Sequence, residues 1–242
     1  MATMNSSTTI DEIADGIYRI FTPVPPEVMA GGFSFNQYLI ADDKPMLYHT
    51  GPRRLYADVS AAVERVLPLS SLAYIGFSHV ESDECGALNE FLAAAPRAVP
   101  VCSEVAAMVS INDLAIREAK PMADGEVLEL GRHRVRWFAT PHLPHGWECA
   151  MAYEETTRTL LCGDLFTQPG HEHAPVTEDD ILEPSEAFRL QMDYFAHSPD
   201  TRMHLRRLSE LQPSTLACMH GSAWRGNGAM LLQKLAERVS PN

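Results

Sequence analysis

The chain has 242 residues, and its hydrophobic share of 45% is enough for one sizeable domain with a packed core. Its formal net charge of −13 argues against nucleic acid or an anionic membrane as a partner, because phosphate recognition depends on basic side chains. The 5 cysteines are scattered and form no CxxC pair, which favours reduced thiols over a disulfide framework.

The amino-terminal segment, residues 1–9, is polar and lacks the basic start and apolar core of a signal peptide. No later stretch is apolar for long enough to span a bilayer. We therefore expect a cytoplasmic protein with no membrane partner. Because no linker, charge block or low-complexity tract divides the sequence, residues 1–242 are predicted to form a single domain.

Strand-like and helical segments alternate along the first half of the chain. The strand-like segments are 16–21, 37–41, 46–49 and 72–77. Asp42-Asp43 is a predicted hairpin turn between the second and the third of these. The helical segments are 54–66, 85–95 and 104–111.

The second half continues the alternation. Further strands are predicted near Val99, Val127, Val135, Met151, Leu160 and Leu216. Further helices are predicted at 185–194, 201–211 and 228–239. This alternation indicates sheets covered by helices, which is an α/β layered fold.

The most informative segment follows the predicted strand at 72–77. It places four side chains that bind metals in quick succession: His79, Glu81, Asp83 and Glu84. A loop at a strand end can turn such side chains toward one point, which a regular helix or strand could not do. Three alternating ligand-type residues directly after an apolar strand predict a metal site.

Later segments offer the residues that would complete this site. Each follows a short apolar run: His142 and His145, then Asp164, then His220. Loops at strand ends on one edge of a layered fold are where ligands distant in sequence converge. The combined set of imidazoles and carboxylates is large enough for two metals.

The order His-x-Glu-x-Asp, then His, Asp and His, resembles the metallo-β-lactamase superfamily, and the resemblance covers nearly the whole chain. Glu81 in place of a second histidine resembles the diiron branch, which comprises flavodiiron proteins and stand-alone oxygen-binding diiron proteins. The resemblance implies a metallo-β-lactamase-like αββα sandwich. The zinc hydrolases of the superfamily have His-x-His-x-Asp-His, so Glu81 and Glu84 each replace an imidazole by a carboxylate.

That replacement favours a different metal. Carboxylates are hard anionic donors that suit iron or manganese, whereas sets rich in nitrogen and sulfur suit zinc. We therefore expect two iron ions rather than zinc or manganese. The resemblance implies that Asp164 bridges both ions. It gives one ion to His79, Glu81 and His145, and the other to Asp83 and His220.

Two candidate catalytic residues have roles that the sequence leaves open. His142 and His145 both follow Thr140-Pro141, and His145 is preferred as the ligand because the stretch from it to Asp164 aligns with flavodiiron sequences without a gap. His142 would then lie in the pocket. Glu84 stands where the family usually has a histidine, and it is a ligand, a proton donor or a first-turn carboxylate that stabilises the following helix.

Other segments near the site have two interpretations each. The stretch 171–173, His-Glu-His, is either a lid above the irons or a separate metal site. Four aromatic residues either wall a dry pocket or belong to the core: Trp147, Phe166, Tyr194 and Trp224. The remaining isolated histidines are interpreted as surface or core groups: His49, His133, His197 and His204.

The resemblance to diiron proteins implies chemistry with dioxygen or nitric oxide. Two ferrous ions supply two of the four electrons that reduce dioxygen to water, so an external electron-donor protein is expected to supply the others. In flavodiiron proteins a fused flavodoxin-like domain bears FMN, and no residues remain here to form one. The chain therefore resembles the stand-alone version, and the family resemblance suggests a homodimer.

Two alternatives compete with gas reduction. One is a dioxygen sensor or carrier that binds the gas without turnover. The other is a hydrolase in which the dinuclear site lowers the pKa of a bound water and polarises an ester, thioester or lactone, with Asp83 orienting the hydroxide. The sequence does not separate these functions.

Overall fold

The amino-terminal half builds the first of two sheets in the computed structural model, which describes residues 8–239. In chain order its strands are β1 (Thr9–Ala14), β2 (Ile17–Val24), β3 (Phe33–Ile40), β4 (Met46–Tyr48), β5 (Tyr74–Gly76), β6 (Val99–Ser103) and β7 (Lys120–Met122). Strands β1 to β4 pair antiparallel, and β4 to β7 pair parallel. The carboxyl ends of β4, β5, β6 and β7 therefore share one edge of the sheet.

The carboxyl-terminal half builds the second sheet, in the order β12-β14-β13-β11-β10-β9-β8. Its strands are β8 (Val127–Glu129), β9 (Arg134–Ala139), β10 (Ala150–Glu154), β11 (Thr159–Leu161), β12 (Val176–Thr177), β13 (Thr215–Ala217) and β14 (Ala223–Arg225). Strands β8 to β11 again pair antiparallel, and β13 joins β11 parallel. Each half thus begins with four antiparallel strands, and the fourth of these pairs parallel with a later strand.

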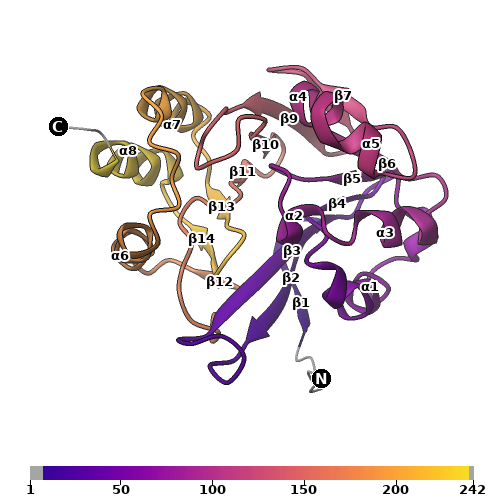
Figure 1. Ribbon diagram of the computed structural model, residues 1–242, viewed down its shortest axis with the longest axis horizontal. Coiled ribbons are helices and arrows are strands. Elements are labelled where there is room, and N and C mark those ends of the chain that lie inside the picture. The colour runs from indigo at the N-terminus through magenta and orange to yellow at the C-terminus, as the bar shows by residue number, and fades with distance from the viewer. Residues whose placement is uncertain (1–7, 240–242) are drawn as a thin grey trace.

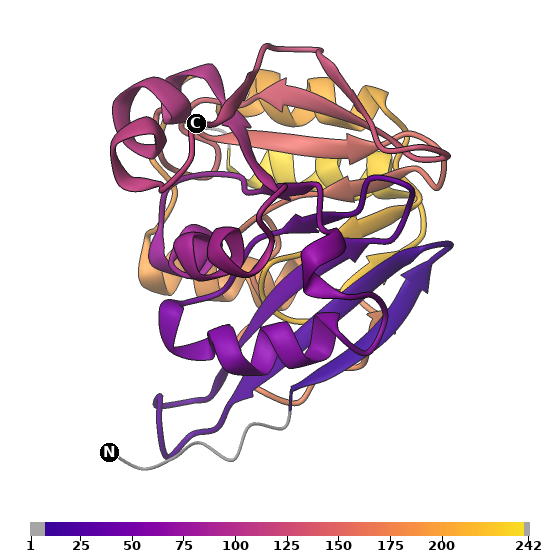
Figure 2. The ribbon, with the colours of Figure 1, turned by 90° about the vertical axis from the view of Figure 1, so that its right-hand side faces the viewer.

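Helices cover the outer face of each sheet. On the first sheet lie α1 (Tyr56–Val63), α2 (Ser82–Cys85), α3 (Leu88–Ala94), α4 (Glu104–Ala106), a π-helical turn (Ala107–Ile111) and α5 (Asn112–Leu114). On the second lie α6 (Leu182–Met192), α7 (Thr201–Glu210) and α8 (Gly228–Arg238). Figure 1 shows α6, α7 and α8 on the opposite side of the molecule from α1 and α3, which face the viewer in Figure 2.

Alternating side chains divide the core into three layers. In β3, Leu39 packs in the layer under α1 and α3, whereas Tyr38 and Ile40 pack in the layer between the sheets. Trp137 of β9 is 1% exposed in the same middle layer. Because both faces of a strand are buried, its sequence is apolar without clear alternation. The expected αββα sandwich is confirmed, and no helix within residues 8–239 is long and apolar enough to cross a bilayer.

Two helix boundaries differ from the predictions for local reasons. The helix predicted at 85–95 is divided into α2 and α3, because the backbone N–H of Ala87 donates to Gly51 O (3.2 Å) instead of continuing the helical ladder. The helix predicted at 185–194 begins at Leu182, where Asp180 Oδ1 accepts a hydrogen bond from Leu182 N (2.8 Å). It ends before Tyr194, since the preceding residue adopts a left-handed backbone conformation.

Candidate metal centre

Loops at the ends of four strands carry the proposed ligands. The loop after β5 holds His79 and Glu81, the loop after β9 holds His145, and the loops after β11 and β13 hold Asp164 and His220. Because β11 and β13 are parallel neighbours, with Leu161 opposite Ala217, the loops that follow them leave the sheet side by side. The two sheets thereby contribute to one site.

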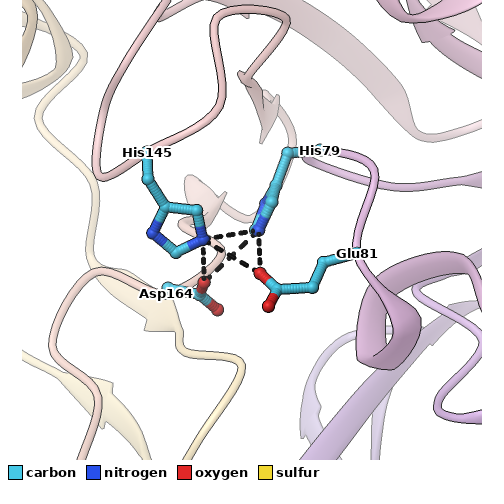
Figure 3. A group of neighbouring side chains, drawn as sticks. All are labelled: His79, Glu81, His145 and Asp164. Carbon is cyan, nitrogen blue, oxygen red and sulfur yellow. Dashed lines mark hydrogen bonds and ion pairs between the residues drawn. The ribbon is translucent and has the colours of Figure 1, made fainter. Parts of the chain in front are cut away.

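Four side chains form the first cluster, shown in Figure 3: His79, Glu81, His145 and Asp164. The Nε2 atoms of His79 and His145 are 2.9 Å apart. Glu81 Oε2 lies 3.2 Å from the first of these nitrogens and 3.0 Å from the second. Asp164 Oδ2 lies 3.5 and 3.4 Å from them, respectively. Two imidazole nitrogens and two carboxylates that face one point form the donor set of a cation site.

The second cluster lies on the other side of Asp164. It comprises Asp83, Glu84 and His220. His220 Nε2 is 3.5 Å from Asp83 Oδ2 and 3.4 Å from Asp164 Oδ1. The two oxygens of Asp164 therefore face different clusters, which is the geometry of a carboxylate that bridges two cations.

Hydrogen bonds orient all three imidazoles in the same way. The Nδ1 atom of each ring is bound to an oxygen: His79 to Ser78 Oγ (2.9 Å), His145 to Tyr194 O (3.0 Å) and His220 to Ser34 O (2.7 Å). A ring whose Nδ1–H is engaged in this way presents Nε2 as its free lone pair. Each histidine is thus prepared to coordinate a metal through the nitrogen that faces the clusters.

The carboxylates of the two clusters favour the binding of positive charge. Hydrogen bonds from His145 and His79 lower the pKa of Glu81 to about 2. Burial raises the pKa of Glu84 well above its ordinary value, and the nearby Asp164 raises it further. Neither carboxylate oxygen of Glu84, which is 0% exposed, has a hydrogen-bond partner among residues 8–239. Buried carboxylates without donors are costly, so this hard, anionic set fits a pair of divalent cations.

The charges also predict how stability depends on pH in protein depleted of metal with a chelator. Burial lowers the pKa of His79 and His220, but the carboxylates around them outweigh it and raise both values. A histidine whose pKa is raised in the folded state stabilises the protein below the unfolded pKa of about 6.5. The gain is about 1.4 kcal/mol for each tenfold increase in proton affinity. It is lost as the pH rises through the folded pKa. Urea unfolding should show the depleted protein losing stability from pH 6 to pH 9. Metal-loaded protein should show a smaller loss, and equal losses would contradict the assignment of these histidines as ligands.

A small pocket of about 230 Å³ opens over both clusters. Phe33, Phe188 and Met192 supply its apolar wall, and Tyr194 lines it beside the proposed ligands. A larger cavity of about 590 Å³ lies behind Glu81 and touches no other proposed ligand. The smaller pocket is therefore the space in which a molecule would meet the metals.

The other aromatic candidates lie elsewhere. Phe166 and Trp224 are buried in the core under α6, α7 and α8, and Trp147 is 57% exposed. Of the four, only Tyr194 lines the pocket. The stretch 171–173 is not among its lining residues, and the neighbouring Gly170 N instead bonds Gly32 O (3.3 Å) in the turn between β2 and β3.

His142 and Glu84, whose roles the sequence leaves open, lie in different places. His142 is exposed and lies outside both clusters, since its backbone N–H donates to Gly146 O (2.8 Å) and closes a turn that directs His145 inward. Glu84 is part of the second cluster, with Oε2 3.8 Å from His79 Nε2. The structure thus brings together seven of the eight candidate site residues.

His49, interpreted from the sequence as a surface or core group, lies against the ligand loops. Its ring contacts Ser78 Oγ (3.1 Å) and Met219 Sδ (2.9 Å), the immediate neighbours of two proposed ligands. One signal was present, because His49 directly follows the apolar strand β4, as the ligand loops follow their own strands. Its partners are distant in sequence, so the pairing itself could not be read.

Comparison with known proteins gives a family match and distant relatives. The model of the family described as "ODP family beta lactamase" matches residues 33–221. The anaerobic nitric oxide reductase flavorubredoxin of Aliivibrio salmonicida is 25% identical over 218 residues, which are 86% of this chain and 43% of that protein. The chain thus spans less than half the length of this relative.

Solved structures share the fold at low identity. The metal-soaked Flv1 flavodiiron core from Synechocystis sp. PCC6803 matches with a TM-score of 0.83 and 22% identity, over 97% of this chain and 61% of that one. Rubredoxin:oxygen oxidoreductase from Desulfovibrio gigas matches with a TM-score of 0.82 and 17% identity, over 95% and 62%. At these identities the likeness demonstrates the αββα fold alone.

Proposed function

The chain belongs to the ODP family beta lactamase group, and on this premise we propose that it is a diiron protein that reduces nitric oxide or dioxygen with electrons from a separate donor protein. The observation that carries the proposal is the bridging placement of Asp164, with one oxygen toward each cluster. The names of its relatives, a nitric oxide reductase and an oxygen oxidoreductase, support the choice of gases.

Each iron would be held by a defined set of side chains. The first set is His79, Glu81 and His145, and the second is Asp83, Glu84 and His220, with Asp164 shared. When bound, two ferrous ions would supply one electron each for reduction of a diatomic gas. The carboxylates of both sets offset the charge of the ions, and their hardness favours iron over zinc. The names of the relatives, which include flavodiiron proteins, support iron over manganese. His142 has no part in this assignment.

The pocket has room for a small substrate beside an apolar wall. Its volume of about 230 Å³ accommodates a diatomic gas. Phe33 and Phe188 stack at 5.9 Å between ring centroids, and Phe33 also packs against the His220 ring at 4.3 Å. This apolar wall lies against one side of the second set.

Electrons would enter at the edge of the first set. The side chain of Glu81 is 53% exposed and that of His145 is 27% exposed, whereas the His79 side chain is 2% exposed. A donor protein that docks on this edge reaches the centre through two ligands. The homodimer that the family resemblance suggests stays a prediction.

Gas consumption by the reduced chain tests this function. The protein is loaded with ferrous iron under anaerobic conditions and given a chemical reductant and a mediator. After nitric oxide or dioxygen is added, a gas electrode should show consumption of the gas in large excess over the protein. The same chain loaded with zinc is the matched control and should consume none. Uptake that stops at one gas molecule per centre would indicate the sensor, and no uptake of either gas by the iron form would contradict the proposal.

A further inference from the structure

His49 occupies a strained, buried position behind the proposed ligands. It is 1% exposed and has a φ of 65°, a left-handed conformation that is uncommon for a residue with a side chain. Its backbone N–H is held by Gly76 O at 2.8 Å. Strained polar residues persist where the surrounding structure requires them, often beside functional sites.

Hydrogen bonds determine which nitrogen of His49 carries the proton. The Nε2 atom lies 3.3 Å from the backbone nitrogen of Ser78, which can only donate, so Nε2 is an acceptor. The ring proton is therefore on Nδ1, which lies 2.9 Å from Met219 Sδ, an atom that can only accept. Burial lowers the pKa of His49 to about 3, so the ring stays neutral with one donor and one acceptor nitrogen.

The same reasoning extends from His49 to His79. The hydroxyl of Ser78 lies 3.1 Å from His49 Nε2 and 2.9 Å from His79 Nδ1. Because His49 Nε2 accepts, the hydroxyl donates to it and is left to accept from His79 Nδ1–H. In the neutral ring, which is the form that binds a metal, the lone pair of His79 is then on Nε2, the atom that faces the first cluster. A hydrogen bond with the Cys149 side chain also raises the pKa of His79, so Ser78 is not the only group that holds this ring.

We propose that His49 is a positioning residue for His79, which it holds through the Ser78 hydroxyl with Nε2 directed at the metal. This inference rests on the proposed metal centre, since it treats His79 as a ligand. His49 does not touch the metal in this account and acts only through its neighbour.

The second contact of His49 joins loops from the two sheets. Met219 precedes His220, and its backbone N–H donates to Gly163 O at 2.9 Å, next to Asp164. Gly163 also packs on Ser78, where an added Cβ would lie 3.1 Å from Oγ. The His49 ring thus lies between Ser78 and Met219, and Met219 in turn binds the loop after β11.

Release of zinc to a chelator tests the effect on metal binding. His49→Phe keeps a ring of similar size and removes both nitrogens. Loss of partners that orient a ligand typically weakens metal binding by about 10- to 100-fold, so we expect zinc release to accelerate by about that factor. His204→Phe, which changes a buried histidine on α7, is the matched control and should release zinc at the wild-type rate. Equal release from both variants would overturn the proposal.

A double variant tests whether His49 acts through Ser78. Ser78→Ala removes the shared hydroxyl, so adding His49→Phe to it should change zinc release little beyond the single variant. If the two effects multiply instead, His49 acts by another route and the proposal fails.

The tautomers can be observed directly in wild-type protein, which needs no variant to fold. Nitrogen-15 NMR of histidine-labelled, zinc-loaded chain should show His49 protonated on Nδ1, and His79 protonated on Nδ1 with its Nε2 bound to zinc. Protonation of His49 on Nε2 would overturn this inference alone. Failure of the chain to bind zinc or iron would overturn it together with the metal centre, and neither result depends on gas reduction.

Discussion

Replacing Asp164 by alanine should remove both metals from the protein. Its Oδ2 atom lies 3.5 Å from His79 Nε2 and 3.4 Å from His145 Nε2, and its Oδ1 atom lies 3.4 Å from His220 Nε2. Each set therefore loses a donor in the same substitution. The two cations would also repel one another without the shared negative charge between them.

The expected magnitude is large because the proposed centre makes Asp164 a direct ligand of both ions. Binding should weaken at each site by more than the roughly 100-fold that loss of an orienting partner costs. Metal content after gel filtration, measured by mass spectrometry with circular dichroism as the check of folding, should fall close to zero. Asp113→Ala, which removes an exposed carboxylate on α5, should leave metal content unchanged. A full complement of metal in Asp164→Ala would place the bridge on another residue.

Replacing His145 by alanine should remove one metal, whereas the same change at His142 should remove none. The Nε2 atom of His145 lies 3.0 Å from Glu81 Oε2 and 2.9 Å from His79 Nε2, at the centre of the first set. His142 is exposed and outside both clusters. The two positions are three residues apart in one loop, so each variant is the matched control of the other.

The metal content of the two variants tests this comparison. We expect His145→Ala to keep the ion held by Asp83 and His220 and to lose the other, and His142→Ala to resemble the wild type. The reverse result would exchange the two histidines. Loss of metal from both variants would mean that the loop as a whole, rather than one side chain, sets metal binding.

The placement of the candidate ligands was predictable because it obeys a local rule. His79, Asp164 and His220 each follow a short apolar strand, and loops at strand ends are where side chains from distant segments meet. The αββα fold was predictable from the resemblance of the same motifs and from the alternation of elements. The choice between His142 and His145 was not settled by the residues alone, because the contact that orients the His145 ring is with Tyr194 O, 49 residues away in the sequence.

What the sequence did not reveal depends on contacts across the chain. The role inferred for His49 requires a partner 170 residues away, Met219, and no local pattern indicates such a pair. Four short strands were also missed: β1, β7, β12 and β14. Their formation depends on pairing with a neighbouring strand more than on their own residues, and β-propensity is a weak guide in such places.

The most direct test of the diiron proposal is the metal content of chain purified anaerobically without added metal. Hard carboxylate donors argue against zinc, and the proposed function requires iron, so we expect about two irons per chain and little zinc or manganese. Two zincs per chain, or a single ion, would contradict the account, the first because of the metal and the second because Asp164 would then bridge nothing.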